Sequence, residues 1–395
     1  MKQIKKLWHY PISGRELYRV VFIIALIQSF LDTTTLPPSI ITKFFHLLGV
    51  GSVVFGMVFK IYVLDEWRPL QYVLITLILG AFAISFLKTG LGGILLYPLL
   101  VLGAKGINFN LVIKDFFRIS LVALSIVMAL AMLGGITNLV YHPIDRATRY
   151  SLGITYPTDL AAHSLLLLLS YYYLRYRRIR VVELIAGLLI GILVYKLTDA
   201  RLDFVATILA IGLIAASQWM VKNQRLVRLH AFMWITTPFI AGVTWFSAFF
   251  YNYHIKLASR LNDLLSNRLY LSKQGFDKYN ILMFGQKIKE HGYGGLKGMK
   301  LFNGKTNIEY FFLDSSYIRL ILIYGLIIFL MVILAMTLVS IKGYMANDYI
   351  LCVIILVLSV TGMVEQHLIE LVYNPFLIAL MATIGSKQNE KIQFK

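Results

Sequence analysis

The chain of 395 residues carries little charge, since Asp, Glu, Lys and Arg make up only 14% of it, and it has a single cysteine, Cys352. A soluble domain holds roughly 25% charged residues, which argues against an ordinary water-soluble enzyme. One cysteine leaves no disulfide within the chain and no cysteine-ligated metal cluster. The alternating segments of a transmembrane β-barrel are missing too, because the apolar runs are unbroken.

Two metal-binding patterns are also missing from the sequence. The His-Glu-x-x-His spacing of a helical zinc site does not occur around His367. No Asp-x-Asp pair is present, because Asp199 and Asp203 stand four residues apart, and such a pair would hold the metal of a sugar-nucleotide site. We therefore expect no metal and no cofactor.

Long apolar segments dominate the chain instead, and 58% of its residues are hydrophobic. A membrane-spanning helix needs about 20 apolar residues, so about 12 spans account for this fraction. We therefore predict an all-α fold, a polytopic helical membrane protein with about 12 transmembrane helices. The predicted spans lie near 18–32, 41–62, 70–87, 90–104, 118–140, 158–174, 182–197, 203–221, 231–250, 314–341, 348–364 and 372–386.

The formal net charge of +19 would raise the question of nucleic acid on a soluble protein. Here the bilayer accounts for it first, because basic residues are retained on cytoplasmic loops and attracted to anionic lipid. Dense basic clusters in the short connections 175–180 and 222–228 set the orientation. We expect a multi-pass protein of the cytoplasmic membrane with both termini in the cytoplasm, with membrane lipids and not nucleic acid as partners.

The longest connection between predicted spans, 251–312, falls on the outer side and holds ten basic and four acidic side chains. Apolar residues recur at helical spacing over 257–269 and 276–288, which predicts two amphipathic helices at the outer interface. The predicted organisation is therefore nine spans in 1–250, a large extracytoplasmic loop in 251–312, and three spans with a cytoplasmic tail in 313–395.

Three arginines on the predicted outer face are candidate anion ligands. Arg149, Arg201 and Arg268 come from three different outer segments, and the guanidinium fork suits phosphate oxygens. Each close arginine would interact with a pyrophosphate by about 4 kcal/mol at an effective dielectric near 20, before desolvation. The alternative for each is a headgroup anchor or a snorkelling side chain.

Acid–base candidates on the same face are Asp314, Glu365 and His367. Asp314 precedes the predicted tenth span and two serines, so its alternative role is a helix N-cap. Glu365 and His367 stand two residues apart on a short turn, where a solvated turn or a structural hydrogen bond is the alternative. A carboxylate fixed by a helix terminus is also preorganised, so capping and catalysis are compatible.

These groups, in this order, resemble the Wzy-type polysaccharide polymerases of Gram-positive bacteria, which are related to O-antigen polymerases and ligases. The likeness rests on Arg149-Tyr-Ser-Leu-Gly-Ile-Thr-Tyr-Pro157, Asp199-Ala-Arg201, Asn267-Arg-Leu-Tyr-Leu with Ile281-Leu-Met-Phe-Gly-Gln286, Leu313-Asp-Ser-Ser-Tyr317, and Val364-Glu-Gln-His-Leu-Ile-Glu370. The ordered set covers about residues 140 to 380 and includes one large external loop before the last three spans. The fold that the resemblance implies is GT-C-like.

The resemblance implies metal-independent glycosyl transfer at the outer face of the membrane. The donor would be an oligosaccharide on undecaprenyl pyrophosphate, and the growing chain would pass to the non-reducing end of another lipid-linked repeat unit. Arg149, Arg201 and Arg268 would then bind the pyrophosphate, and a base would take the acceptor proton. Ligases use a histidine where this chain has Asp314. A flippase and a chain-length regulator are expected partners; a lipid-linked oligosaccharide flippase and an O-antigen-ligase-like transferase are the alternative functions.

Overall fold

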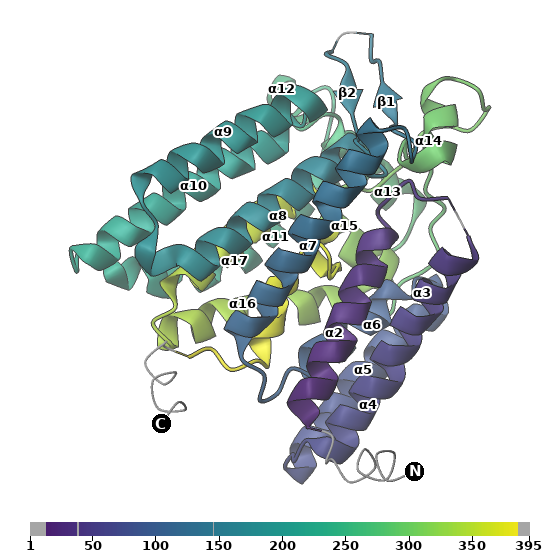
Figure 1. The fold of residues 1–395 in the computed structure, drawn as a ribbon. Coiled ribbons are helices and arrows are strands. Elements are labelled where there is room, and N and C mark those ends of the chain that lie inside the picture. Colours follow the sequence, from purple (N-terminus) through teal and green to yellow (C-terminus); the bar gives the residue numbers. More distant parts are fainter. Residues whose placement is uncertain (1–12, 38, 145, 386–395) are drawn as a thin grey trace.

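The computed structural model describes residues 13–37, 39–144 and 146–385, and their regular structure is almost entirely helical (Figure 1). Seven of the described helices are long and apolar enough to cross a membrane. They cover Thr42–Leu64, Pro69–Thr89, Phe109–Met132, Val181–Thr198, Arg201–Lys222, Val227–Phe249 and Leu326–Met345. The end of the predicted cytoplasmic tail lies outside the described residues.

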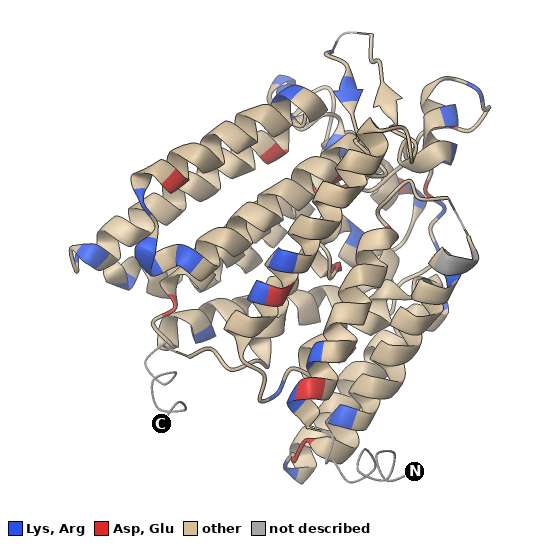
Figure 2. Cartoon of the chain, viewed as in Figure 1, with Lys and Arg blue, Asp and Glu red and all other residues tan. Residues whose placement is uncertain are grey.

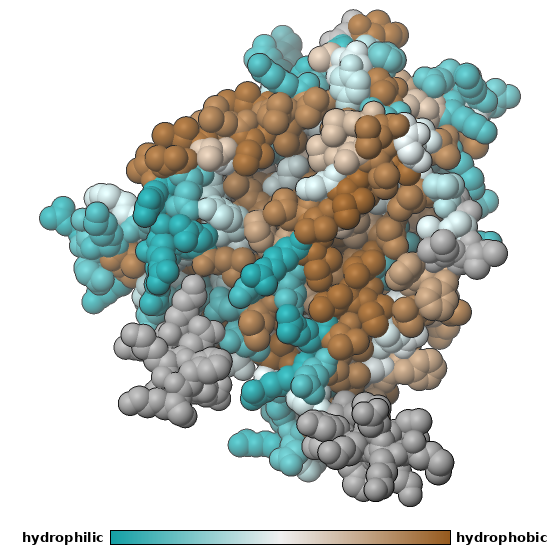
Figure 3. Space-filling view, viewed as in Figure 1, coloured by the Kyte–Doolittle hydropathy of each residue, from teal (hydrophilic) through white to brown (hydrophobic). Residues whose placement is uncertain are grey.

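The surface has the polarity of a membrane protein. Hydrophobic residues cover the sides of the helices, whereas hydrophilic residues gather toward their ends (Figure 3). Charged residues follow the same distribution along the ribbon (Figure 2). Many large apolar side chains on these helices are exposed, including Leu77 at 64% and Phe239 at 66%. Side chains of this kind are stable only against an apolar solvent, which a bilayer supplies.

The amino-terminal part of the chain forms one group of helices. It consists of α2 (Gly14–Leu31), α3 (Ile40–Gly51), α4 (Met57–Phe59) between the π-helical turns Ser52–Gly56 and Lys60–Leu64, α5 (Pro69–Thr89), α6 (Gly93–Leu102) and α7 (Phe109–Met132). The helix α2 packs against both α3 and α7. Pro69 starts α5, where its missing N–H costs nothing, and Gly90 ends it in a left-handed conformation with φ 76°.

The middle and carboxy-terminal parts form the other group. They contain α8 (Pro157–Arg175), a 3-10 turn at Tyr176–Arg178, α9 (Val181–Thr198), α10 (Arg201–Lys222), a 3-10 helix at Val227–Ile235, α11 (Thr236–Phe249), α15 (Ser316–Arg319), a π-helical turn at Leu320–Tyr324, α16 (Leu326–Met345) and α17 (Tyr349–Thr361). The short helix α17 is the most enclosed of these, because it packs against both α10 and α16.

The hairpin, α12, α13 and α14 lie together at one end of the helices (Figure 1). The hairpin joins β1 (Val140–Tyr141) to β2 (Arg149–Tyr150), and the three helices are α12 (Lys256–Leu264), α13 (Arg268–Lys278) and α14 (Gly295–Phe302). The prediction of a second amphipathic helix over 276–288 is wrong, because the chain leaves helical conformation after Lys278. Gly285, with φ 80°, sits in the middle of that stretch.

The stretch 282–286 pairs with a break in the helix that α15 begins. Gly325 has φ 99° and separates the π-helical turn Leu320–Tyr324 from α16. The Leu326 and Ile327 N–H groups donate to the Leu282 and Met283 carbonyls at 2.9 and 3.1 Å, and the Gln286 N–H donates to the Ile323 carbonyl at 2.9 Å. Backbone groups freed by the break are thereby satisfied, as apolar surroundings require.

Besides the tenth predicted span, which breaks at Gly325, two predicted spans differ from the structure. The fifth was expected over 118–140 but α7 covers Phe109–Met132, because the Asn108 side chain caps its start and a buried Asp115 is paired with Arg19 at 2.6 Å. The expected last span, 372–386, contains only a 3-10 helix at Pro375–Leu380. Proline lacks the N–H that an α-helix interior needs.

Candidate functional site

A cavity of about 410 Å³ opens at the end of the molecule where the hairpin and α13 lie. Its walls come from β2, the start of α8, the turn between α9 and α10, the start of α13 and the turn after α17. The polar side chains around it are Arg146, Arg149, Tyr156, Thr158, Asp199, Arg201, Asp203, Ser266, Asn267, Arg268, Tyr270, Gln274, Tyr293, Glu309, Tyr310, Asp314 and Glu365. Segments separated by more than two hundred residues in the sequence therefore share one hollow.

One wall of the cavity is built around two predicted arginines. Arg149 is buried on β2, where its Nε donates to the Thr198 carbonyl at 2.7 Å and its Nη1 donates to the Tyr156 hydroxyl at 3.2 Å. Arg201 is the first residue of α10, and its side chain is 61% exposed. Arg149 is thus held rigidly by protein acceptors, while Arg201 presents most of its guanidinium to the open space.

Asp199 organises this wall from the end of α9. It adopts a left-handed conformation with φ 46°, which turns the chain sharply between α9 and α10. Its carboxylate accepts from the Arg146 Nε at 2.7 Å and lies 3.6 Å from the Arg201 Nε. Arg146 and Arg201 therefore share one carboxylate. With Arg149 in the same wall, the wall keeps an excess of positive charge.

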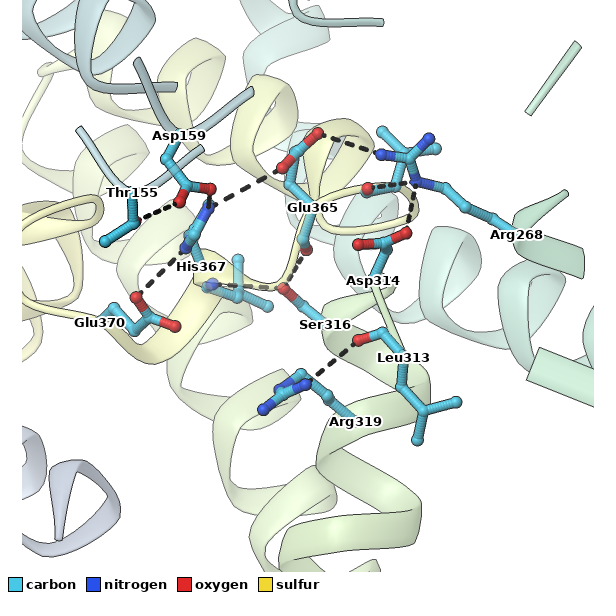
Figure 4. A network of polar contacts seen from close by, with 12 residues as sticks. Thr155, Asp159, Arg268, Leu313, Asp314, Ser316, Arg319, Glu365, His367 and Glu370 are labelled. Carbon is cyan, nitrogen blue, oxygen red and sulfur yellow. Dashed lines mark hydrogen bonds and ion pairs between the residues drawn. The ribbon is translucent and has the colours of Figure 1, made fainter. Parts of the chain in front are cut away.

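A second wall of the cavity is acidic, and its carboxylates lie around Arg268, the first residue of α13 (Figure 4). Its side chain is 12% exposed, and its Nε donates to the Val364 carbonyl at 2.7 Å. The same guanidinium lies 3.6 Å from an Asp314 oxygen and 3.5 Å from a Glu365 oxygen. Burial alone would lower the Arg268 pKa, but Asp314 and Glu365 together raise it, so the arginine stays charged.

The loop that carries Asp314 is fixed on both sides. Before it, one Glu290 oxygen accepts from the Leu313 N–H at 3.0 Å and from Arg319 at 2.7 Å. After it, the Ser316 hydroxyl donates to the Glu365 carbonyl and accepts from the Leu368 N–H at 3.2 Å (Figure 4). Asp314 and the turn after α17 are therefore tied into one rigid unit.

The two carboxyl groups on this wall hold their protons more tightly than free acids do. Burial raises the Asp314 pKa, and the positive Arg268 and Arg319 oppose that rise. Burial and the neighbouring Asp203 raise the Glu365 pKa well above its ordinary value, against the charges of Arg268 and His367. A carboxylate with a raised pKa is a stronger base, which is the property that proton abstraction from a hydroxyl needs.

His367 lies behind the cavity wall, in an adjoining hollow that it shares with Asp203 and Glu365. Its Nδ1 is 3.1 Å from a Glu370 oxygen, and its Nε2 is 3.4 Å from Asp159 and 3.8 Å from Glu365. Burial alone would lower the imidazole pKa, but Glu370 and Asp159 together raise it well above the ordinary value. The ring therefore holds its proton at neutral pH and does not accept another.

Five of the six predicted site residues line this cavity, namely Arg149, Arg201, Arg268, Asp314 and Glu365, and His367 stands next to it. Asp203 was not predicted as a site residue, although it lines the same cavity from the first turn of α10. Its signal in the sequence was an acidic side chain at the start of an apolar span, close to Arg201. Its burial could not be inferred from the sequence.

The arginine wall suits the binding of an anionic ligand. The acidic wall suits a ligand whose hydroxyl group gives up a proton. Within the described ranges, no group of three or more His, Cys, Asp or Glu residues is arranged to hold a metal ion. The arginine wall is preorganised by β2 and Asp199, so it can bind negative charge with little rearrangement. The acidic wall supplies fixed carboxylates within the same hollow.

No protein-family model matches this chain, no curated protein is significantly similar to it, and no solved structure matches its fold.

Proposed function

We propose that the protein is a Wzy-type polysaccharide polymerase, a metal-independent glycosyltransferase that acts at the outer face of the cytoplasmic membrane. The donor is a glycan on undecaprenyl pyrophosphate, and the acceptor is the non-reducing end of a second lipid-linked repeat unit. The observation that carries the proposal is the cavity with one wall of arginines and one wall of buried carboxylates. Glycosyl transfer from a pyrophosphate needs both, because an anion leaves while a proton is removed.

In the proposed reaction the acceptor hydroxyl oxygen attacks the anomeric carbon of the donor glycan, and the bond from that carbon to the pyrophosphate oxygen breaks. The hydroxyl proton passes to a carboxylate, and undecaprenyl pyrophosphate leaves with the bonding electrons. Arg149 and Arg201 bind the leaving pyrophosphate from the positive wall. Arg268 reaches the same space with the N–H groups that its protein acceptors leave free.

Asp314 is the proposed base, with Glu365 as the second candidate. Both carboxyl groups line the cavity, both are held by Arg268, and both have raised pKa values. His367 has the weaker claim to be the base, because its imidazole already carries a proton and is oriented by Glu370 and Asp159. In this scheme His367 orients Glu365 from behind the wall.

The proposed topology has about 12 spans with both termini in the cytoplasm, so that the cavity opens outward. The hairpin, α13 and the cavity lie at the end of the helices opposite the connection between α8 and α9, which carries the basic cluster 175–180 (Figures 1 and 2). That separation supports an outward cavity, because basic clusters in short connections stay in the cytoplasm. The proposed partners are membrane lipids, a flippase that delivers the repeat units and a chain-length regulator.

A flippase is the second candidate function, since it also needs many spans and a basic cavity. It would carry charge along a central path through the spans, whereas the polar side chains of this cavity come from elements at one end of the helices. A ligase-like transferase is a third candidate, and Asp314 stands against it because ligases use a histidine at the comparable place. The three candidate functions differ in which glycan a cell accumulates when the protein is absent.

The decisive experiment is a deletion strain. A polymerase mutant should display single repeat units at the cell surface and make no long polymer, whereas a flippase mutant should display neither. Complementation with Arg201→Lys should restore protein level but little polymer, because lysine keeps the charge and loses the fork. Arg260→Lys is the matched control, since Arg260 is exposed on α12 and outside the cavity. Long polymer in the deletion strain would refute the proposal.

A further inference from the structure

Among the cavity-lining carboxylates in the described part of the chain, Asp203 is the one whose two oxygens are both fully buried without a hydrogen-bond partner. The residue is 4% exposed, in the first turn of α10. It borders the main cavity and also the adjoining hollow that contains Glu365 and His367. One Glu365 oxygen is likewise buried without a hydrogen bond, although Arg268 lies 3.5 Å from it.

Buried polar atoms in native proteins are normally hydrogen-bonded, because leaving a carboxylate oxygen without a donor costs free energy. The neighbours of Asp203 do not meet this need. Arg268, His367 and Arg149 act on it electrostatically from a distance, and each already donates to other protein acceptors. A partner for the Asp203 carboxylate must therefore come from the space that it borders.

The charges around Asp203 select the chemistry of that partner. A phosphate would be repelled, since Asp203, Glu365 and Asp314 line this part of the cavity together. A metal cation or an amine would meet the fixed positive charges of Arg268 and His367. A neutral group with several hydrogen-bond donors remains, and sugar hydroxyls are such donors.

We propose that Asp203 and Glu365 form a binding subsite for the hydroxyl groups of the acceptor sugar, distinct from the arginine wall that takes the pyrophosphate. The inference rests on the proposed function for the identity of its ligand, because it assigns the acceptor to one wall and the donor phosphate to the other. Each carboxylate accepts hydrogen bonds from sugar hydroxyls, so that the reacting hydroxyl is placed beside Asp314. Asp203 is thus a substrate-binding residue of the inner wall.

The test separates the two ligands by using each alone. The full-length protein in lipid nanodiscs is titrated with undecaprenyl pyrophosphate, which carries no sugar. In parallel it is titrated with the repeat-unit oligosaccharide released by mild acid from the host's lipid-linked intermediates, which carries no phosphate. Asp203→Asn should weaken oligosaccharide binding about tenfold, the effect of losing a hydrogen bond to a charged group, and leave undecaprenyl pyrophosphate affinity within about twofold. Asp263→Asn on the exposed face of α12 is the control and should change neither.

Arg201→Lys should give the reverse pattern, with weaker undecaprenyl pyrophosphate binding and unchanged oligosaccharide binding. If Asp203→Asn does not fold, Glu365→Gln takes its place with the same expected pattern. Wild-type oligosaccharide affinity in the variant, an equal loss of both ligands, or no oligosaccharide binding by the unaltered protein would each overturn the subsite. If the unaltered protein fails to bind undecaprenyl pyrophosphate, that result counts against the proposed function. The oligosaccharide titration still tests the subsite at Asp203 and Glu365 separately.

Discussion

Replacing Arg268 tests the link between the two halves of the site. Its guanidinium lies 3.6 Å from Asp314 and 3.5 Å from Glu365, and its Nε bonds the Val364 carbonyl. At an effective dielectric near 20, each of the two ion pairs is worth about 5 kcal/mol before desolvation. Removing one partner of a buried ion pair costs about 3 to 5 kcal/mol, because the other partner is left uncompensated.

Arg268→Gln should therefore lower the free energy of unfolding by about 3 kcal/mol. Its effect on activity should depend on pH. The two carboxylates lose their positive neighbour, so their pKa values rise further, and a base with a higher pKa is protonated over a wider range of acid pH. The acid limb of the pH–rate profile should move to higher pH, with turnover near neutral pH reduced by about 10²-fold and partly restored in alkali.

The assay is polymer formation by the purified protein from lipid-linked repeat units, followed on gels between acid and alkaline pH. Arg268→Lys should lie between wild type and Arg268→Gln, because one ammonium cannot reach both carboxylates as the fork does. Arg260→Gln, an exposed change on α12, is the control for charge alone. A wild-type acid limb in Arg268→Gln would refute the reasoning, since it would mean that neither carboxylate is the base.

Three further outcomes are expected. Cysteine placed at the exposed Lys289 in a Cys352→Ser background should react with an impermeant maleimide in whole cells; protection until lysis would contradict an outward cavity. Asp314→Asn should cost roughly 10²-fold or more in turnover with little effect on folding, whereas wild-type turnover would shift the base to Glu365. His367→Gln should lower the free energy of unfolding by about 3 kcal/mol at pH 6. Because the His367 pKa is raised, its ion pairs contribute fully below the ordinary histidine pKa and are lost as pH rises through the raised value, so the deficit should fade in alkali. A deficit that is independent of pH, measured by thermal unfolding, would show that only packing is lost.

Much of the fold follows from periodicity and charge, which act along the sequence. Long apolar runs predicted helices such as Pro69–Thr89 and Leu326–Met345, because a helix satisfies all its backbone groups within one segment, as lipid requires. The boundaries of α7 were missed because polar residues near its start read as a loop. Asp115 lies inside that helix, where Arg19 of α2 neutralises it at 2.6 Å, and a pair between distant segments leaves no local signal.

The candidate site was predictable in its location more than in its geometry. Alternate connections of a helical membrane protein lie on the same side, which places Arg149, Arg201 and Arg268 at one end of the molecule. The contacts within the site depend on side-chain direction and burial. Two features of the site are the ion pairs of Arg268 and the carboxylate of Asp203, whose oxygens have no hydrogen-bond partner. Both depend on how α10, α13 and the turn after α17 pack together, and the sequence of one segment does not determine that packing.

The pairing of residues 282–286 with the helix break at Gly325 has a consequence for any attempt to exchange residues 251–312 between proteins. A β-carbon at Gly285 would lie 1.9 Å from the Ile323 carbonyl oxygen, and one at Gly325 would lie 2.3 Å from the Gly285 nitrogen. The two glycines are a matched pair, so neither segment accepts an ordinary residue at the crossing. A chimera that transplants 251–312 without the start of α16 would strand the Leu326 and Ile327 N–H groups. The smallest transferable unit therefore runs from the end of α11 through the first turn of α16.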